Sequence, residues 1–183
     1  MTTTLQEKSE AATSNKIAQG MLAEFEHELA TTRRFLERVP ADKFNWRPHE
    51  KSMTAGQLAL HIATIPESVL ALGLNDIAQL PNFGDWKTPA STQEMLDILE
   101  RGANFVRKNL PTISDEHMHE IWTLVKDLKS DPHVVLTSMP RVAFLRSILL
   151  NHWYHHRGQL GVYLRLIGAK VPSSYGPSGD ESP

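Results

Sequence analysis

Apolar side chains recur at spacings of three and four residues in four long segments of the chain. This period is typical of amphipathic helices with one buried face. The first segment begins near Ala18 and ends at Pro40, because proline cannot continue a helix. The pattern predicts a single helix whose inward positions are Ala18, Leu22, Phe25, Leu29, Thr32, Leu36 and Val39.

The second segment begins after Ser52 or Thr54, and either hydroxyl is suited to cap the first turn of a helix. Pro66 lies inside the segment and predicts a kink, because proline lacks a backbone N–H. Residues 75–89 follow as a predicted polar loop. His61 lies on the same stripe as the apolar residues and is expected to face inward with Leu58, Ile62, Ile65, Val69 and Leu72.

The third segment has a predicted cap at Ser91 or Thr92 and stops at Pro111. The chain that follows, from 112 to 140, carries no helical period. Within it, two short apolar runs are predicted either to pair as a hairpin or to form a packed loop, and the pattern leaves both open. These runs are Ile121 to Val125 and His133 to Thr137.

The fourth segment begins near Pro140 and ends at Ile167, with Gly168 as a terminal glycine. Four such helices predict an all-α protein, a four-helix bundle with an irregular or hairpin insertion before the last helix. We expect residues 15–175 to form this bundle, with a flexible leader at 1–14 and a flexible tail at 176–183. The stripe of the last helix is Leu145, Ile148, Leu149, His152, His156, Leu160, Tyr163 and Ile167.

The composition is that of an ordinary globular protein, with 40% apolar and 22% charged residues and a net charge of −2. Lys and Arg are scattered rather than clustered, so a nucleic-acid partner is not expected. No apolar run approaches the ~20 residues of a membrane span, and residues 1–20 lack the apolar core of a signal peptide. We therefore expect a cytoplasmic protein with no membrane partner.

The strongest chemical signal is a pair of histidines in the last helix, His152 and His156. Residues four apart point the same way from a helix, and neutral imidazole is a common metal ligand. The pair can therefore share one divalent cation. Zinc proteases with this spacing carry a glutamate directly after the first histidine, whereas this chain has Trp153, which excludes that class.

His61 supplies the third imidazole that a metal site of this kind needs. Three histidine ligands leave coordination positions open, which is typical of catalytic rather than structural sites. The alternative is a set of buried histidines held by hydrogen bonds, because a polar ring on an apolar stripe needs partners for its nitrogens. His155 lies near the same face, and helix geometry leaves open whether His155 or His156 is the partner of His152.

The chain has no cysteine, which excludes disulfides, thiolate ligands and a cysteine nucleophile. Any thiol chemistry must use a thiol from a substrate or cofactor. Four neighbouring residues have expected roles. Gln57, one turn before His61, is placed to orient a ligand or bound water, whereas Glu67 turns away from the site. Arg157 is expected to hold a carboxylate on a neighbouring helix, and Gly158 to permit close helix packing.

Several of these residues together resemble the DinB family of helical bundles. The resemblance covers the chain from about Ala18 to Tyr175, and its most specific part is the string HHRGQL at a fixed distance after a histidine-bearing helix. The matching positions are Trp46, Ser52, Gly56-Gln57-Leu58-Ala59-Leu60-His61-Ile62, His152, His156-Arg157-Gly158-Gln159-Leu160, Leu164-Arg165, Gly168, Pro172 and Tyr175-Gly176.

The resemblance implies that His61, His152 and His156 are the ligands of a divalent metal ion, either nickel, zinc or manganese. It also implies a homodimer, since many members pair. The members with established activities use low-molecular-weight thiols such as bacillithiol, glutathione or mycothiol. The resemblance therefore favours a metal-dependent thiol S-transferase acting on electrophilic small molecules. A metal-dependent hydrolase and a non-catalytic, stress-responsive metal-binding bundle are the alternatives.

Overall fold

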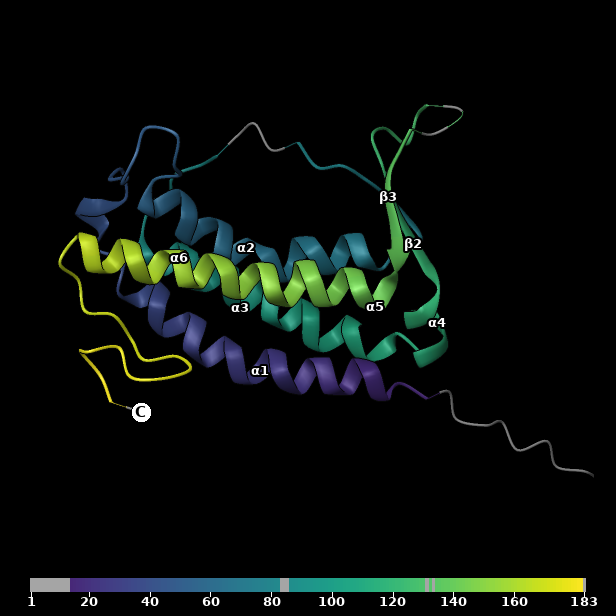
Figure 1. The fold of residues 1–183 in the computed structure, drawn as a ribbon, viewed down its shortest axis with the longest axis horizontal. Helices are drawn as coiled ribbons and strands as arrows, with labels where there is room; N and C mark the ends of the chain where they lie inside the picture. Colours follow the sequence, from purple (N-terminus) through teal and green to yellow (C-terminus); the bar gives the residue numbers. More distant parts are fainter. Residues whose placement is uncertain (1–13, 83–85, 131, 133, 183) are drawn as a thin grey trace, which may run out of the picture.

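The computed structural model describes residues 14–82, 86–130, 132 and 134–182. Long helices run side by side along most of the molecule (Figure 1). They are α1 (Lys16–Glu37), α2 (Ala55–Gly73), α3 (Thr92–Asn109) and a last helical run made of α5 (Arg141–Phe144), the π-helical segment η3 (Leu145–Asn151) and α6 (His152–Leu166). The connecting turns are η1 (Ala41–Lys43), η2 (Leu110–Thr112) and α4 (Asp115–His119).

The helix starts follow the predicted capping chemistry and resolve both choices that the sequence left open. Thr54, not Ser52, caps α2: its hydroxyl accepts from the Gln57 N–H, and the Gln57 side chain accepts from the Thr54 N–H. Ser91, not Thr92, caps α3 by accepting from the Glu94 N–H. The four predicted helices are therefore confirmed, and α2 continues through Pro66 to Gly73.

The fold is mostly helical, as expected, but a small sheet departs from a purely helical bundle. Its strands are β1 (Ile77–Gln79), β2 (Ile121–Val125) and β3 (Val135–Pro140), in the order β1-β2-β3. β2 and β3 pair antiparallel, which confirms the predicted hairpin, although His133 lies outside the described residues. β1 pairs parallel with β2 from within the predicted polar loop. A strand of three residues is too short to show an alternating pattern, so only its pairing with a distant segment reveals it.

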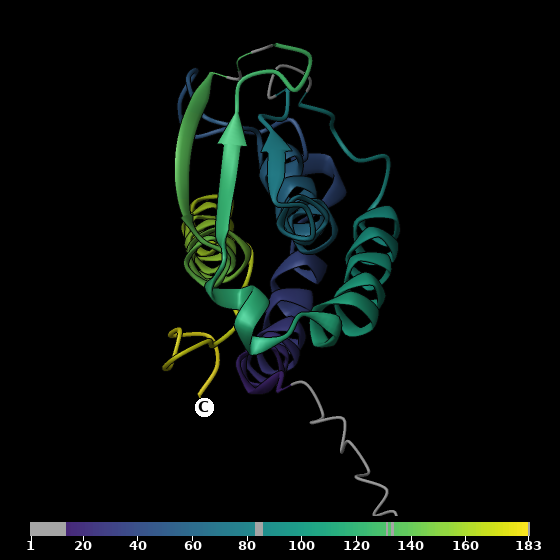
Figure 2. The same cartoon turned by 90° about the vertical axis from the view of Figure 1, so that its right-hand side faces the viewer.

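The sheet stands across one end of the long helices (Figure 2). One face of its hairpin turns toward α2 and the last helical run. Trp122 of β2 is fully buried there, stacks on Phe144 with ring centroids 3.7 Å apart and donates its indole N–H to the Leu72 carbonyl. Leu124 and Thr137 are cross-strand partners on the same face. The hairpin thus extends the wall of the space between the two helices.

Helix α2 is the central helix of the core, and it packs against both α3 and α6. Trp153 joins three of the helices: its indole N–H donates to the Ile62 carbonyl of α2 at 2.9 Å, and its ring stacks on Phe25 of α1 at 5.1 Å. Both aromatic side chains are fully buried. This contact fixes the relative height of α1, α2 and α6 near the middle of the molecule.

By length and composition alone, α2 is also apolar enough to cross a membrane, with a mean hydropathy of 1.2. No other helix in the described ranges meets that criterion. Since 56% of the relevant stretch of α2 is buried inside the protein, its apolar character matches its place in the core.

The last helical run is not a regular α-helix. Its seven-residue segment η3 is π-helical, and the His152 N–H accordingly bonds to the Ser147 carbonyl five residues earlier. The wider turn changes which residues face inward just before the histidines. Leu149 and Leu150 are fully buried, whereas Ile148 is 37% exposed and faces the pocket described below.

Candidate metal centre

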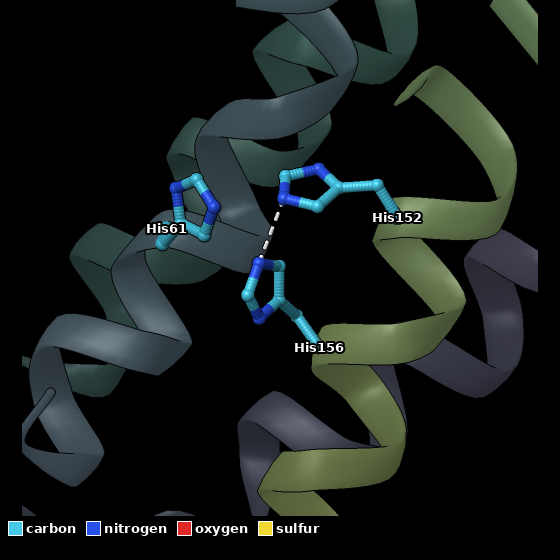
Figure 3. Close-up of side chains that lie close together, drawn as sticks. All are labelled: His61, His152 and His156. Atoms are coloured by element: carbon cyan, nitrogen blue, oxygen red, sulfur yellow. Dashed lines mark hydrogen bonds between the residues drawn. The ribbon is translucent and has the colours of Figure 1, made fainter. Parts of the chain in front are cut away.

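The structure brings His61, His152 and His156 together from two different helices. His61 extends from α2, and the other two extend from successive turns of α6, with all three rings turned toward one another (Figure 3). The ring centroids are 4.4 to 5.4 Å apart. One nitrogen from each ring lies within 4.8 Å of the other two, a spacing that a single ion can bridge. His155 is exposed and is not part of this group.

The two histidines of α6 approach each other through their Nε2 atoms, which are 2.8 Å apart. Two imidazole lone pairs repel at that distance, so a proton or a cation must lie between them. His156 Nδ1 lies 2.6 Å from Oε1 of Gln159, which accepts its proton and leaves the Nε2 lone pair facing the site. His152 Nδ1 is buried and makes no hydrogen bond of ordinary geometry among the described residues, although the Ile148 carbonyl one turn earlier acts on the ring. This donor set fits a metal ion better than a closed hydrogen-bond network.

The three imidazoles are neutral near pH 7. Burial, together with the nearby His156 and His152 rings, lowers the pKa of His61 to about 4. Burial also lowers the pKa of His152 to about 4, assisted by His156 and His155 and opposed by the Ile148 carbonyl. The pKa of His156 is lowered by burial, against the opposing effect of Gln159. Neutral rings keep the lone pairs that metal binding requires.

The histidines lie at one end of a pocket of about 880 Å³. Its two long walls are the α2 side chains from His61 to Leu72 and the opposite helical run from His156 back to Phe144. The hairpin closes the far end, and the chain after β1 borders the opening. Its remaining lining residues are Met53, Ile65, Ser68, Val69, Leu80, Pro81, Asn82, Trp86, Trp122, Leu124, Thr137, Met139, Ile148 and His152.

Trp86 and Gln57 meet beside His61, and the sequence did not suggest their contact. The Trp86 ring meets the His61 ring edge-on at 5.2 Å, while the Gln57 amide donates to the Trp86 carbonyl at 3.1 Å. Because the other end of the Gln57 amide completes the cap of α2, this side chain holds backbone on both sides. The prediction that Gln57 orients a ligand is therefore replaced by a role in attaching the chain near Trp86 to α2.

Of the predictions for the other neighbouring residues, two are confirmed and one is wrong. Glu67 turns away and pairs with Arg101 of α3 at 2.8 Å, as expected. Arg157 holds the Glu28 carboxylate of α1 at 2.5 Å, also as expected. Gly158 does not mediate close packing, because a Cβ there would meet nothing within 4 Å. Gly161 has that role, since its Cβ would lie 3.2 Å from the Phe35 ring.

One further group of metal-ligand residue types occurs among the described residues: Asp76, His117 and Glu120. Asp76 is engaged by the buried guanidinium of Arg141 at 2.5 Å, and His117 by Glu120 at 2.6 Å. Asp76 and Glu120 are also largely exposed. A fixed cation at this position disfavours a second one, so the three histidines are the stronger candidate.

The fold and the site together define a mostly helical protein with a small sheet and three histidines that converge at a pocket. The chain belongs to the DinB family, whose profile matches residues 11–182.

Individual relatives agree with this assignment. The uncharacterized protein YrdA of Bacillus subtilis is 26% identical over 164 residues, which cover 87% of this chain and 89% of that protein. A crystal structure of a DinB-like protein from Bacillus cereus has a TM-score of 0.65 and 25% identity, covering 86% of this chain and 97% of that one. The DinB-like protein YjoA of Bacillus subtilis shares the fold, with a TM-score of 0.64, 20% identity and coverage of 85% and 96%.

Proposed function

We propose that this protein is a metal-dependent enzyme in which His61, His152 and His156 hold a divalent cation, either nickel, zinc or manganese. The proposal is carried by the convergence of three neutral imidazoles at the end of a pocket large enough for a small-molecule substrate. A divalent cation bound by neutral ligands keeps its full charge, and it acidifies a thiol or a water molecule in an open coordination position.

The reaction we favour is transfer of an external thiol to an electrophilic small molecule. The thiol sulfur forms a bond to the electrophilic carbon, the leaving group departs with the bonding electron pair, and the thiol proton passes to solvent. The chain's own residues would position both reactants: the histidine end receives the sulfur, and the pocket receives the electrophile. The thiol must come from outside, because the chain contains no cysteine.

Hydrolysis by an activated water is the second candidate, since the same three histidines serve it equally well. The apolar lining of the pocket favours thiol transfer. Among the described lining residues, few side chains offer hydrogen bonds that would hold water next to the substrate. The homodimer and the cytoplasmic location stay predictions.

Metal content is the first test of this proposal. Untagged protein, incubated with nickel, zinc or manganese and then desalted, is analysed by plasma mass spectrometry beside His152→Ala and His155→Ala. We expect about one equivalent of one metal in the parent and in His155→Ala, which loses only an exposed histidine. His152→Ala should retain less than about a tenth. Equal metal in all three proteins, or none in the parent, would contradict the proposed centre.

Thiol consumption is the second test. The metal-loaded protein is given bacillithiol, glutathione or mycothiol together with an aryl halide electrophile, and product is followed by its absorbance. Thiol-dependent turnover in the parent and in His155→Ala, with loss in His152→Ala, would support transferase activity. Turnover of an ester without any thiol would favour the hydrolase instead. Metal binding without either activity would leave the non-catalytic alternative.

A further inference from the structure

The lining of the pocket carries information about the substrate. Apart from the three histidines, its described side chains are apolar except for Ser68, Asn82 and Thr137, and no Lys, Arg, Asp or Glu is among them. Ser68 already donates its hydroxyl to the Thr64 carbonyl within α2. A charged group that entered this part of the pocket would lose its hydration without gaining a counter-ion. The body of the substrate must therefore be uncharged.

The pocket is also elongated and has two different ends. Along α2 its lining residues follow one face from His61 to Leu72, a rise of about 16 Å. The opposite wall descends in steps of four from His156 through His152 and Ile148 to Phe144. The histidines occupy one end of both walls, and the stacked pair of Trp122 and Phe144 closes the other. The three imidazoles are thus confined to one end of the pocket.

Large apolar side chains around the pocket are left partly uncovered by the protein. Leu80, Trp86 and Ile148 are 37%, 42% and 37% exposed, and all three line this pocket. Exposed apolar surface that turns into a concave site is typical of a surface that a ligand covers. Trp86 lies beside His61, so the uncovered surface continues up to the histidines.

From these observations we propose the substrate class: an uncharged, largely apolar and elongated small molecule that lies along α2 with its one polar, reactive group at the histidines. This inference rests on the proposed function, since it assigns the polar end to the metal site. The far end of the molecule lies against the hairpin, so Trp122 and Phe144 limit its length. The apolar body is bound by burial, and its affinity rises with each methylene that the pocket covers.

The test measures binding and needs no turnover. The uncharged fluorophore N-phenyl-1-naphthylamine is bound to chelator-treated protein and displaced by unbranched 1-alkanols of increasing length. Each added methylene should tighten binding about threefold to fourfold. The gain should stop at about twelve carbons, where the alkyl chain reaches the hairpin. Alkyltrimethylammonium ions and alkanoates of equal length should bind at least tenfold more weakly. Equal binding of charged and uncharged chains, or no dependence on length, would overturn the proposal.

Two matched variants test whether the probe occupies this pocket. Ser68→Phe fills the middle of the pocket from α2, whereas Ala71→Phe adds the same ring at an exposed position of α2 outside the lining. We expect Ser68→Phe to weaken decanol binding at least tenfold and Ala71→Phe to change it less than twofold. Circular dichroism melting of both variants confirms that they are folded. The same affinity for decanol in both would place the probe elsewhere and contradict the proposal.

Added metal tests which end of the ligand lies at the histidines. It also separates the proposed substrate class from the proposed metal centre. When metal is added, alkanoates should gain at least tenfold in affinity because the carboxylate reaches the cation, and His152→Ala should remove the gain. Metal binding without that gain would overturn the assignment of the polar end to the histidines. If no metal binds but the alkanol series behaves as expected, the proposed metal centre fails while the uncharged substrate class stands.

Discussion

Helix α6 carries two pairs of residues with the same four-residue spacing, offset by one position, and the two pairs differ in how their polar atoms are satisfied. Trp153 and Arg157 face α1 and α2, and His152 and His156 face the pocket. Arg157 is 2% exposed, and its guanidinium meets the carboxylate and carbonyl of Glu28 as well as two hydroxyl groups, those of Thr32 and Tyr175. Among the described residues, each of these polar groups has a partner.

The histidine pair has the opposite character. His152 Nδ1 makes no hydrogen bond of ordinary geometry among the described residues, and the two Nε2 atoms face each other at 2.8 Å. A buried polar group without a partner costs free energy, so a protein keeps it only where something else depends on it. The comparison teaches that burial alone does not mark the site on this helix. What marks it is a buried polar cluster left incomplete beside a pocket.

The largest change in the free energy of unfolding should come from the Arg157 side of the helix, where the polar groups have partners. Arg157→Ala leaves the Glu28 carboxylate buried without its counter-charge, which should lower the free energy of unfolding by about 3 to 5 kcal/mol. His152→Ala loses packing but also removes an unsatisfied nitrogen, so it should change stability by no more than about 1 kcal/mol. Urea denaturation of the chelator-treated proteins measures both. The double variant Glu28→Leu/Arg157→Leu should recover most of the loss. Equal losses for Arg157→Ala and His152→Ala would show that the two sides of the helix do not differ in this way.

A smaller effect is expected from the hydrogen bond that orients His156. Gln159→Leu removes the acceptor at Nδ1 and should weaken metal binding by about tenfold to a hundredfold. Gln159→Glu keeps an acceptor and should bind metal at least as tightly as the parent. Competition against a chromophoric chelator gives the dissociation constants. Identical affinities in all three proteins would show that Gln159 does not position the ring.

The last effect concerns pH. In chelator-treated protein the pKa values of His61 and His152 lie at about 4, below the ordinary value of 6.5 that the unfolded chain restores. Between these values the unfolded chain binds more protons than the folded protein. The contribution of the two histidines to the free energy of unfolding is therefore complete above pH 6.5, and it decreases as the pH is lowered toward 4. Urea midpoints measured across this window should show the decline. The double variant His61→Asn/His152→Asn should show a shallower one; an unchanged slope would contradict the assignment.

Sequence patterns predicted what depends on local periodicity. The helix bounds, the inward face of His61 and the partner of Arg157 all follow from spacing on a regular helix. The resemblance added the choice of His156 over His155, and the structure places His156 in the cluster. What escaped prediction depends on distant pairing. β1 exists because it meets β2, some forty residues later in the chain, and Gln57 is held by the Trp86 carbonyl.

The fourth predicted helix also shows where a prediction from residue spacing fails. Its predicted stripe assumed one uniform period, but η3 interrupts that period before His152. Ile148 was expected in the core beside Leu149, and instead it lines the pocket. No residue type in 145–151 demands a π-helix on its own. The segment reflects two well-packed regions on either side, each of which fixes its own part of the helix.

In genetic terms, a π-helical turn corresponds to one codon inserted into an α-helix. Removing one residue from Leu145–Asn151 would restore the ordinary winding and leave the direction of the following residues nearly unchanged, because the wide turn already accommodates one extra residue. The same deletion between His152 and His156 has no wide turn to absorb it, and it would rotate the residues after it by about 100° away from their partners. The π-helical segment is therefore a place where this helix can change its length by one residue and keep both the histidine pair and the Trp153–Arg157 pair in position.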